Sequence, residues 1–415
     1  MSRRWRGILA GALATLAAVG FLYGCNAIVG VEDVRLRAKR DTGTGTGTTG
    51  TQDGDTPAKA NVVLLALGDK HTCARLLDGT ARCWGQSSQG QVGAGAGDGG
   101  PVTSPRVVSN VSDAIDIAAG QNHTCVARQS GGVKCWGLNL DGQLGNGESG
   151  NVHTVPVDVA SVANAIAVAA GGNFSCALRS SGTVVCWGGN LSGQLGNGTL
   201  NGTSTPAVVS NLSGAVAIAA GDAHACAVKT DGTVVCWGDG TNGQLGNGST
   251  TTSLTPVAVV LSDAIQVTAS ERSTCALTTH GTILCWGANE VGQLGTGAAN
   301  DMPNATPIVV ANLDDAVNVA GGQNHTCASR KAGKVACWGS ATNGDLGNTL
   351  DAGFQAGIVT VTGLTNASLA GAGGLHSCAT TSDNGVSCWG ANDVGQLGNG
   401  MSTDSPTPVQ VSGFQ

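Results

Sequence analysis

The sequence is poor in aromatic and charged residues, and this scarcity narrows the range of fold classes. Of its 415 residues only 3% are aromatic and 11% are charged, whereas 41% are hydrophobic and 67 are glycine. So much glycine indicates many tight turns and small side chains in crowded positions. The composition therefore favours an all-β protein with many hairpins over a helical bundle.

The chain also lacks a basic surface. Its formal net charge is −7, and removal of residues 1–24, which hold three arginines and no acid, would leave −10. No basic stripe runs through the rest of the sequence. An acidic chain repels a phosphate backbone, so we expect no nucleic acid among its partners.

No apolar run reaches the length of about 20 residues that a bilayer-spanning helix needs. The run at 8–22 has 15 residues, follows a basic segment at 3–6 and ends in Leu22-Tyr23-Gly24-Cys25. This ending resembles the bacterial lipoprotein box, in which a cysteine receives lipid. The pattern predicts a lipoprotein-type signal peptide at 1–24 and lipidation of Cys25, and the alternative is an ordinary signal peptide that contains a cysteine.

A low-complexity segment follows. Residues 25–60 include a basic run, Arg35 to Arg40, and a Thr-Gly stretch, Thr42 to Thr51. Such a segment buries too little apolar surface to offset its ordering entropy, which predicts a flexible tether. We expect the mature protein in the cell envelope, lipid-anchored and facing the periplasm or the cell exterior.

From residue 61 onward one unit recurs seven times. In each unit a cysteine is followed ten positions later by Cys-Trp-Gly, and a Gly-Gln-Leu-Gly motif or a variant begins seven residues after that second cysteine. The first cysteine recurs every 49 to 52 residues. This fixed register predicts a repeat architecture.

Each unit has the pattern of four strands. Residues 216–221 are small and apolar, as an innermost strand beside a crowded axis should be, and 224–228 and 234–238 flank the hairpin signal Thr-Asp-Gly. The two cysteines centre on Asp231, which predicts a three-residue loop with Gly232 in the left-handed conformation. A fourth strand is expected around a proline, and proline suits an edge position.

Seven units of four strands predict a seven-bladed β-propeller over residues 61–415, because each small sheet buries its faces only against its neighbours. An open solenoid is the alternative, but no capping repeat is present. The first unit starts at Val62–Leu67, and the chain ends with a strand at Pro408–Val411. We expect these two terminal strands to pair within one blade and close a monomeric ring.

The unit resembles the regulator of chromosome condensation repeat. The best copy runs from His123-Thr124-Cys125 through Cys135-Trp136-Gly137 to Gly142-Gln143-Leu144-Gly145. The resemblance covers residues 61–415 and implies a seven-bladed propeller. The nucleotide exchange activity of the best-known member is not carried over, because only scaffold motifs match. Two blades depart from the repeat pattern. Blade six has Gly344-Asp345-Leu346-Gly347 in place of Gly-Gln-Leu-Gly, and blade five has Ser270 and Ser273 in place of Gly and His.

Fourteen of the 15 cysteines are paired by this spacing, and Cys25 is the remaining one. Opposed positions across a hairpin have Cα atoms about 4.5–5.5 Å apart, which suits a disulfide. A zinc site needs converging ligands, usually in Cys-x-x-Cys knuckles, and the sequence has none. In an exported chain the spacing predicts seven disulfides, with free thiols as the alternative. The predicted pairs are Cys73 with Cys83, Cys125 with Cys135, Cys176 with Cys186, Cys226 with Cys236, Cys275 with Cys285, Cys327 with Cys337, and Cys378 with Cys388.

Five histidines share the slot two residues before the first cysteine. Phe174 and Ser273 fill this slot in the other two units, so we interpret it as structural, with buried and hydrogen-bonded imidazoles rather than a metal site. His153 and His280 lie in loops. The slot histidines are His71, His123, His224, His325 and His376.

Chemistry-bearing motifs are absent from the sequence. The repeated Gly-x-x-Gly-x-Gly lacks the Lys-Ser/Thr of a phosphate loop. No serine, cysteine or carboxylate set has the pattern of a catalytic site. We therefore predict no catalytic, metal or cofactor-binding residues.

The segments that vary most between units are predicted to be loops, and rigid scaffolds commonly bind partners through such loops. We therefore predict a module that binds another protein or an envelope polymer. The alternatives are a propeller lyase or hydrolase acting on an extracellular polymer, and a structural adhesin or envelope scaffold. The predicted loops are 97–105, 148–155, 199–205, 249–255, 298–306 and 349–357.

Overall fold

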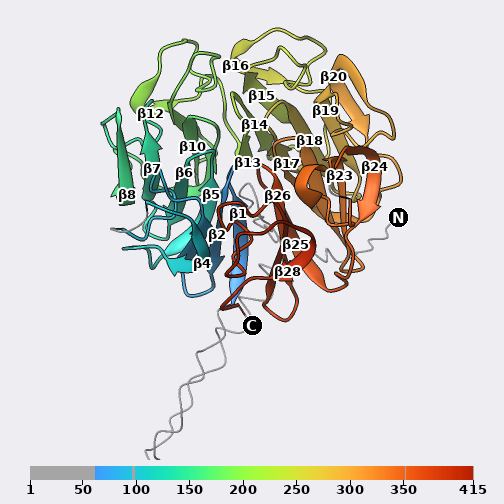
Figure 1. Cartoon of the computed structure of the whole chain (residues 1–415). Helices are drawn as coiled ribbons and strands as arrows, with labels where there is room; N and C mark the ends of the chain where they lie inside the picture. Colours follow the sequence, from blue (N-terminus) through green and yellow to red (C-terminus); the bar gives the residue numbers. More distant parts are fainter. Residues whose placement is uncertain (1–60, 96–98, 351, 415) are drawn as a thin grey trace, which may run out of the picture.

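The computed structural model describes residues 61–95, 99–350 and 352–414, so the predicted signal peptide, the tether and Cys25 lie outside the described residues. This described part contains seven four-stranded antiparallel sheets, each made of four consecutive strands. Figure 1 shows the sheets as blades around a central axis, with the first strand of each blade innermost. The predicted all-β, seven-bladed propeller is confirmed.

Blades one to seven each run from an inner strand to an outer edge strand. The inner strands are β1 (Val62–Leu67), β5 (Ala114–Ala119), β9 (Ala165–Ala170), β13 (Ala215–Ala220), β17 (Ala264–Ala269), β21 (Ala316–Gly321) and β25 (Ala367–Ala372). The second strands are β2 (His71–Leu76), β6 (His123–Arg128), β10 (Phe174–Arg179), β14 (His224–Lys229), β18 (Ser273–Thr278), β22 (His325–Arg330) and β26 (His376–Thr381). The third strands are β3 (Ala81–Gly85), β7 (Val133–Asn139), β11 (Val184–Gly188), β15 (Val234–Gly238), β19 (Ile283–Asn289), β23 (Val335–Ser340) and β27 (Val386–Gly390). The outer strands are β4 (Val102–Val107), β8 (Asn151–Asp158), β12 (Thr203–Val208), β16 (Ser253–Ala258), β20 (Asn300–Val309), β24 (Phe354–Thr360) and β28 (Ser405–Gln410).

The hairpin between the second and third strands sets the register of each blade. In blade four the Lys229 N–H donates to the Thr233 carbonyl and the Gly232 N–H donates back to the Lys229 carbonyl, both at 2.9 Å. Gly232 has a φ of 78°, and Asn384 takes the same left-handed conformation in blade seven with a φ of 69°. The predicted three-residue loop is therefore confirmed, and asparagine tolerates the position because its short polar side chain is the best substitute for glycine there.

Strand direction decides which segments share a face of the ring. Because the strands alternate, the turns between first and second strands lie at the same end as the loops between third and fourth strands. The Gln86 N–H, for example, donates to the Lys70 carbonyl at 2.8 Å. We call this end of the propeller the loop face. The opposite end carries the short hairpins and the connections between blades.

The predicted loops are only partly loops. Asn289 pairs with Asn300, and Gly287 pairs with Asn304, so β20 already begins inside the segment predicted as the loop 298–306. The other outer strands also begin before the ends of their predicted loops. The prediction was wrong there because the residues after each turn satisfy their backbone groups on the third strand.

The predicted closure by pairing of the terminal strands is wrong. β1 pairs with β2 in blade one, and β28 pairs with β27 in blade seven. Each sequence unit coincides with one blade from inner to outer strand, so no strand is left over at either end. The ring instead closes by face-to-face packing of blade seven on blade one, where the Gly374 N–H donates to the Gly68 carbonyl at 3.1 Å.

Candidate functional site

One buried tryptophan holds each junction between neighbouring blades. The indole N–H of Trp237 in blade four donates to the Gln194 carbonyl of blade three at 2.9 Å. A Cβ at Gly196 would lie 2.7 Å from the Trp237 ring, so only glycine fits at the end of the Gly-Gln-Leu-Gly motif. The predicted packing role of these tryptophans is confirmed. The other indole–carbonyl pairs, also at 2.9 Å, are Trp84–Gln396, Trp136–Gln91, Trp187–Gln143, Trp286–Gln244, Trp338–Gln293 and Trp389–Asp345.

A histidine and a hydroxyl complete five of the junctions in the described ring. Where blade seven meets blade one, the Thr72 hydroxyl donates to the Gln396 carbonyl at 3.0 Å and lies 2.7 Å from Nε2 of His376. A hydroxyl has one proton, so it accepts from His376, whose Nε2 therefore carries a proton. The other pairs are His71–Thr124, His123–Ser175, His224–Thr274 and His325–Ser377, at 2.8 or 2.9 Å.

Burial keeps these imidazoles neutral. All five are at most 1% exposed. Burial lowers the pKa of His71 and His376 to about 3, and that of the other three to about 4. The structural interpretation of this slot is confirmed.

In the two units that lack the slot histidine, a second residue also differs from the other units. Phe174 faces the junction to blade four, and there Ala225 takes the position of the hydroxyl. In blade five, Ser273 replaces histidine where Ser270 replaces glycine. A Cβ at the equivalent Gly221 would lie 2.5 Å from the His224 ring, so a histidine and a side chain at this glycine position exclude each other.

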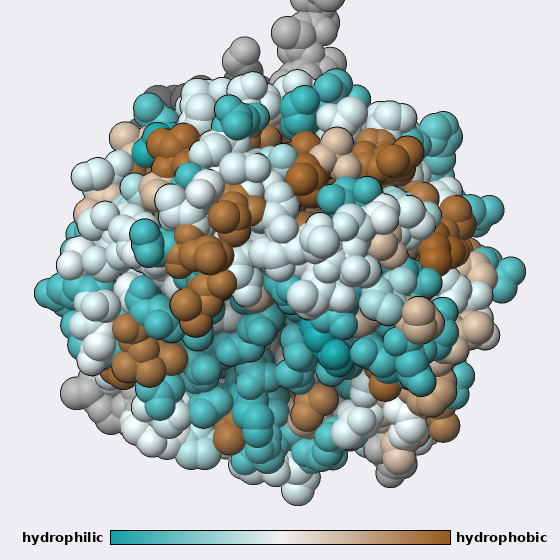
Figure 2. Space-filling view, turned by 90° about the horizontal axis from the view of Figure 1, so that it is seen from above, coloured by the Kyte–Doolittle hydropathy of each residue, from teal (hydrophilic) through white to brown (hydrophobic). Residues whose placement is uncertain are grey.

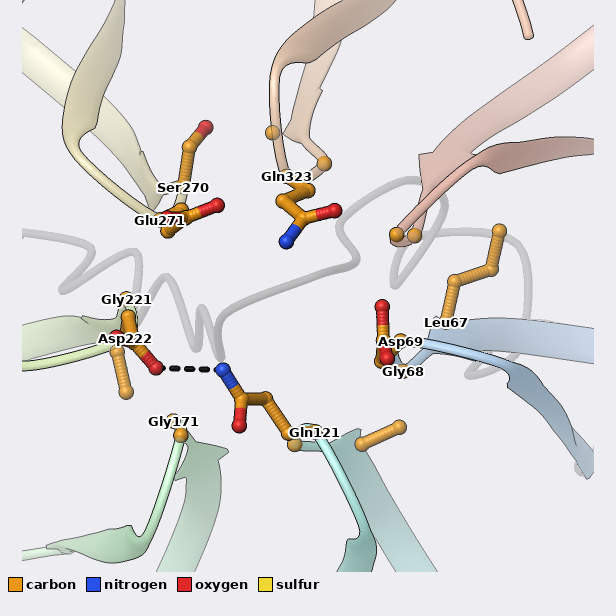
Figure 3. Close-up of a pocket in the computed structure, with 18 of the residues that line it drawn as sticks. Leu67, Gly68, Asp69, Gln121, Gly171, Gly221, Asp222, Ser270, Glu271 and Gln323 are labelled. Atoms are coloured by element: carbon orange, nitrogen blue, oxygen red, sulfur yellow. Dashed lines mark hydrogen bonds between the residues drawn. The ribbon is translucent and has the colours of Figure 1, made fainter. Parts of the chain in front are cut away.

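The central channel opens on the loop face through a ring of polar residues. They occupy one slot, two positions before the histidine slot, in the turn that follows each inner strand. Figure 3 shows Asp69, Gln121, Asp222, Glu271 and Gln323 around the opening. This ring was not predicted from the sequence, although a polar residue at one fixed slot in five of seven units is a signal that could have indicated it. We call the set the channel mouth; its residues are Asp69, Gln121, Gly172, Asp222, Glu271, Gln323 and Gly374.

Three carboxylates lie at the channel mouth, and one of them, Glu271, is 3.7 Å from Nε of Arg272. Burial, together with the Glu271 charge, raises the pKa of Asp222. Burial also raises the pKa of Asp69, with Lys70 opposing the shift and Glu271 adding to it. The Gln121 amide donates to Oδ1 of Asp222 at 2.6 Å and holds that carboxylate at the opening (Figure 3). A positively charged group at the mouth would relieve this repulsion.

The opening is narrow. Its cavity measures about 100 Å³, whereas pockets for small-molecule ligands usually measure about 300–1,000 Å³. Below the mouth the channel is lined by small side chains such as Ala118, Ala169 and Ala219. The dimensions suit one inserted side chain rather than a bound sugar or nucleotide.

A second cavity, of about 160 Å³, is lined by residues that include Lys70, Asp393 and Asp404, and Lys70 is already bound to Asp393 there. Seen from the side on which β16 lies, apolar residues form small patches separated by hydrophilic and neutral ones (Figure 2). The most exposed large apolar side chains include Leu191 at 90% and Val260 at 84%. Isolated exposed apolar residues of this kind are ordinary on a soluble surface. We therefore place the candidate site at the channel mouth and the loops around it.

The described residues form neither a metal-binding cluster nor a membrane-spanning helix. No group of three or more His, Cys, Asp or Glu side chains lies close enough to hold a metal ion. No helix of that part of the chain is long and apolar enough to cross a bilayer. His153 was predicted in a loop, but it lies in β8 and pairs with Gly137, and its Nε2 is 3.2 Å from Glu148. His280 lies in a hairpin, with Nδ1 3.3 Å from Asp263.

The structure joins each predicted cysteine pair by a disulfide across the central hairpin of its blade. Their Cα atoms lie 4.0–4.1 Å apart, closer than the spacing expected from the sequence. All fourteen cysteines are buried. In the described residues the disulfides join Cys73 and Cys83, Cys125 and Cys135, Cys176 and Cys186, Cys226 and Cys236, Cys275 and Cys285, Cys327 and Cys337, and Cys378 and Cys388.

The fold defines a class of protein, the seven-bladed propeller, here with polar residues around the mouth of its central channel. Comparison with known families is specific. The RCC1-like domain family matches residues 166–415, and the regulator of chromosome condensation (RCC1) repeat matches 62–91, 114–143, 78–127 and 130–178. The chain belongs to the RCC1-like family.

Similar proteins align with only part of the chain. The ultraviolet-B receptor UVR8 of Arabidopsis thaliana is 30% identical over 37% of this chain and 36% of its own length. The human probable E3 ubiquitin-protein ligase HERC6 is 32% identical over 38% of this chain and 16% of its own length. This chain thus matches well under two thirds of either relative.

Solved structures show the same fold. Prp20p of Saccharomyces cerevisiae, described with its binding to Gsp1p and histones, has a TM-score of 0.70 at 22% identity, over 85% of this chain and 87% of its own. Human WBSCR16 has a TM-score of 0.72 at 22% identity, over 79% of this chain and 94% of its own.

Proposed function

We propose that this protein is an exported, lipid-anchored, monomeric propeller whose loop face binds a positively charged segment of another protein. The observation that carries the proposal is the channel mouth, where three carboxylates surround an opening that fits one side chain. Among similar propellers, Prp20p is described with its protein partners Gsp1p and histones, which supports a protein as the ligand.

The chemistry of the mouth favours a lysine or arginine side chain. Inserted from the loop face, its charged end would lie among Asp69, Asp222 and Glu271 at the mouth. Charge attraction would also speed the encounter with a basic partner.

A propeller enzyme acting on an extracellular polymer is the second candidate. It rests on the raised pKa of Asp69 and Asp222, since perturbed carboxyl groups in a cleft are common in active sites. The small volume of the opening favours binding of a side chain over binding of a polymer ring. Release of sugars or oligomers from envelope polymers by the purified chain would favour the enzyme instead.

Binding is tested with the full-length chain carrying Cys25→Ser, using a hexalysine and a hexaglutamate peptide as probes. We expect hexalysine to bind, with an affinity that falls as salt rises, and hexaglutamate not to bind. Neutralising the mouth by Asp69→Asn, Asp222→Asn and Glu271→Gln together should weaken hexalysine binding about tenfold, at about 0.5 kcal/mol for each partly exposed charge.

The matched control removes the same charge from other parts of the surface, with Asp158→Asn, Asp231→Asn and Asp314→Asn. These exposed acids lie at the end of an outer strand, in a hairpin and in a connection between blades. Equal affinity of the mouth variant and the control variant would show that the mouth does not bind the peptide.

Anchoring rests on the sequence around Cys25, which lies outside the described residues. All other cysteines are joined in disulfides, which leaves this thiol for lipid. Cys25→Ser should abolish lipid labelling and release the protein from membranes on fractionation. Unchanged labelling of the variant would contradict the lipoprotein prediction.

A further inference from the structure

Blade six differs from the other six blades at the glutamine of the Gly-Gln-Leu-Gly motif. Elsewhere this side chain is an uncharged amide, whereas blade six has Asp345. The Asp345 side chain follows the short helix η1 (Thr342–Gly344) and is 0% exposed. A carboxylate buried this deeply costs free energy unless it is paired or protonated.

A histidine side chain lies beside this carboxyl group. Oδ2 of Asp345 lies 3.6 Å from Nδ1 of His325, and within the described residues neither atom has a hydrogen-bond partner. His325 uses Nε2 toward the Ser377 hydroxyl at 2.8 Å, and this hydroxyl donates to the Asp345 carbonyl at 2.9 Å. Nε2 therefore carries the imidazole proton, and a bare Nδ1 faces the carboxyl group.

Other charged groups do not neutralise Asp345. At the far end of β22, Arg330 is bound to Asp315 at 2.6 Å. The adjoining blade contributes the neutral His376 on β26 and, after β27, Asp393, which is bound to Lys70 at 2.8 Å. The strands β21, β23, β25 and β27 and the helix η1 contain no charged residue.

We propose that the buried Asp345 carboxyl group is protonated opposite the bare Nδ1 of His325, which makes the junction between blades six and seven an alkali-sensitive joint of the ring. The proton resides on the carboxyl group and faces the bare Nδ1. Loss of that proton to solvent leaves a buried carboxylate against an imidazole lone pair, in the contact that also positions Ser377 and Trp389.

The pKa values agree with this geometry. Burial raises the pKa of Asp345 to about 8 and lowers that of His325 to about 4, so the one-proton state spans the range between them. In the unfolded chain the corresponding values are 3.8 and 6.5. Between pH 6.5 and 8 the folded pair therefore holds a proton that the unfolded chain has lost, and stability falls as pH rises through this window.

The test is thermal unfolding of the full-length, oxidised protein between pH 6 and 9. We expect the wild-type midpoint to fall by several degrees above pH 6.5, and we expect Asp345→Gln, which restores the residue of the other blades, to remove most of that fall. The matched variant is Gln143→Asp, which places a carboxyl group beside His123 in blade two and should add a second alkaline loss. Gln143 suits this exchange because its Nε2 has no partner among the described residues.

Parallel pH curves for the wild type and Asp345→Gln would overturn the proposal. If Asp345→Gln does not fold, carboxyl-carbon NMR of the wild-type protein decides the question. Burial also raises the pKa of Asp116, to about 7, so an aspartate that titrates near pH 8 in addition to Asp116 would support the proposal. Absence of any aspartate that titrates above about pH 7 would overturn it.

Discussion

The junction between blades three and four and the junction that closes the ring use the same indole contact but differ around it. Both have a tryptophan that donates to a glutamine carbonyl at 2.9 Å. The closing junction adds His376 and Thr72, whereas the third junction has Phe174 and Ala225 at these positions. The third junction is also joined by the peptide chain, and the closing junction is not.

The two junctions differ in their peptide link rather than in the histidine as such, because four linked junctions also carry a histidine and a hydroxyl. A connecting peptide keeps blades three and four close at all times. The closing junction gains its proximity from non-covalent contacts, and there Phe414 takes the slot that Leu212 fills before blade four. The Phe414 ring lies 5.8 Å from the Trp84 ring, and the guanidinium of Arg82 lies 5.5 Å from the Phe414 ring.

The histidine and the hydroxyl are not equally dependent on each other. At the junction between blades five and six, Thr326 keeps its bond to the Gln293 carbonyl at 3.4 Å although Ser273 replaces the histidine. Every slot histidine in the described chain, however, faces a threonine or serine. A buried imidazole N–H without an acceptor is costly, whereas a hydroxyl is satisfied by the carbonyl alone.

The largest effect is expected from Phe414→Ala at the closing junction. Phe414 is 0% exposed, and removal of a buried phenylalanine ring costs about 3–5 kcal/mol. Because the loss lies where the ring opens, we also expect a lower denaturant m-value, measured by urea unfolding under oxidising conditions.

The control for this prediction is Leu212→Ala, in the same slot before blade four. It should lower the midpoint but leave the m-value unchanged, because the peptide chain still links the two blades. Equal m-values for the two variants would break the distinction between closing and linked junctions.

Phe174→His is the next largest change, and it should be partly rescued by Ala225→Thr. The single substitution buries an imidazole N–H without an acceptor and removes ring packing, at about 3 kcal/mol. The added hydroxyl supplies the acceptor, so the double variant should be more stable than Phe174→His alone by at least about 1 kcal/mol. Chemical denaturation of the four proteins of this cycle measures the coupling, and additive effects would count against the paired arrangement.

Thr72→Val and Thr326→Val compare a hydroxyl that accepts a hydrogen bond from a histidine with one that does not. Thr72→Val leaves the His376 N–H unpaired and should cost about 1–3 kcal/mol. Thr326→Val loses only a long hydroxyl–carbonyl bond and should cost about 0.5–1.5 kcal/mol. A larger loss for Thr326→Val in urea unfolding would contradict the role assigned to the histidines.

The smallest effect concerns acid. Burial lowers the pKa of His224 to about 4 from 6.5, so the unfolded chain takes up a proton before the folded chain does, and stability falls as pH drops through that range. Phe174→His with Ala225→Thr adds one more such histidine and should steepen the acid loss by up to about 1.4 kcal/mol per pH unit. Urea midpoints at pH 7, 6 and 5 measure this, and an unchanged slope would show that the new imidazole is not held neutral.

The local elements were predictable because their signals lie within a few residues. Cys226, Gly232 and Cys236 define a hairpin by spacing and turn chemistry alone, and the structure has that hairpin. The closure was mispredicted because the phase of a repeat does not show where one blade ends. The pairing of β28 with β27 shows that the last blade ends at β28 and that blade one does not receive this strand.

The sequence by itself determined the number of units, the central hairpin of each blade and the structural nature of the histidine slot, because these depend on fixed spacings within one unit. Only the tertiary structure decided how the ring closes, that Asp69, Asp222 and Glu271 meet at one opening, and that Asp345 faces His325. The mouth residues lie about 50 residues or more apart in the chain. They meet because the turn after each inner strand lies beside the central axis, and the inner strands surround one axis only in the closed ring.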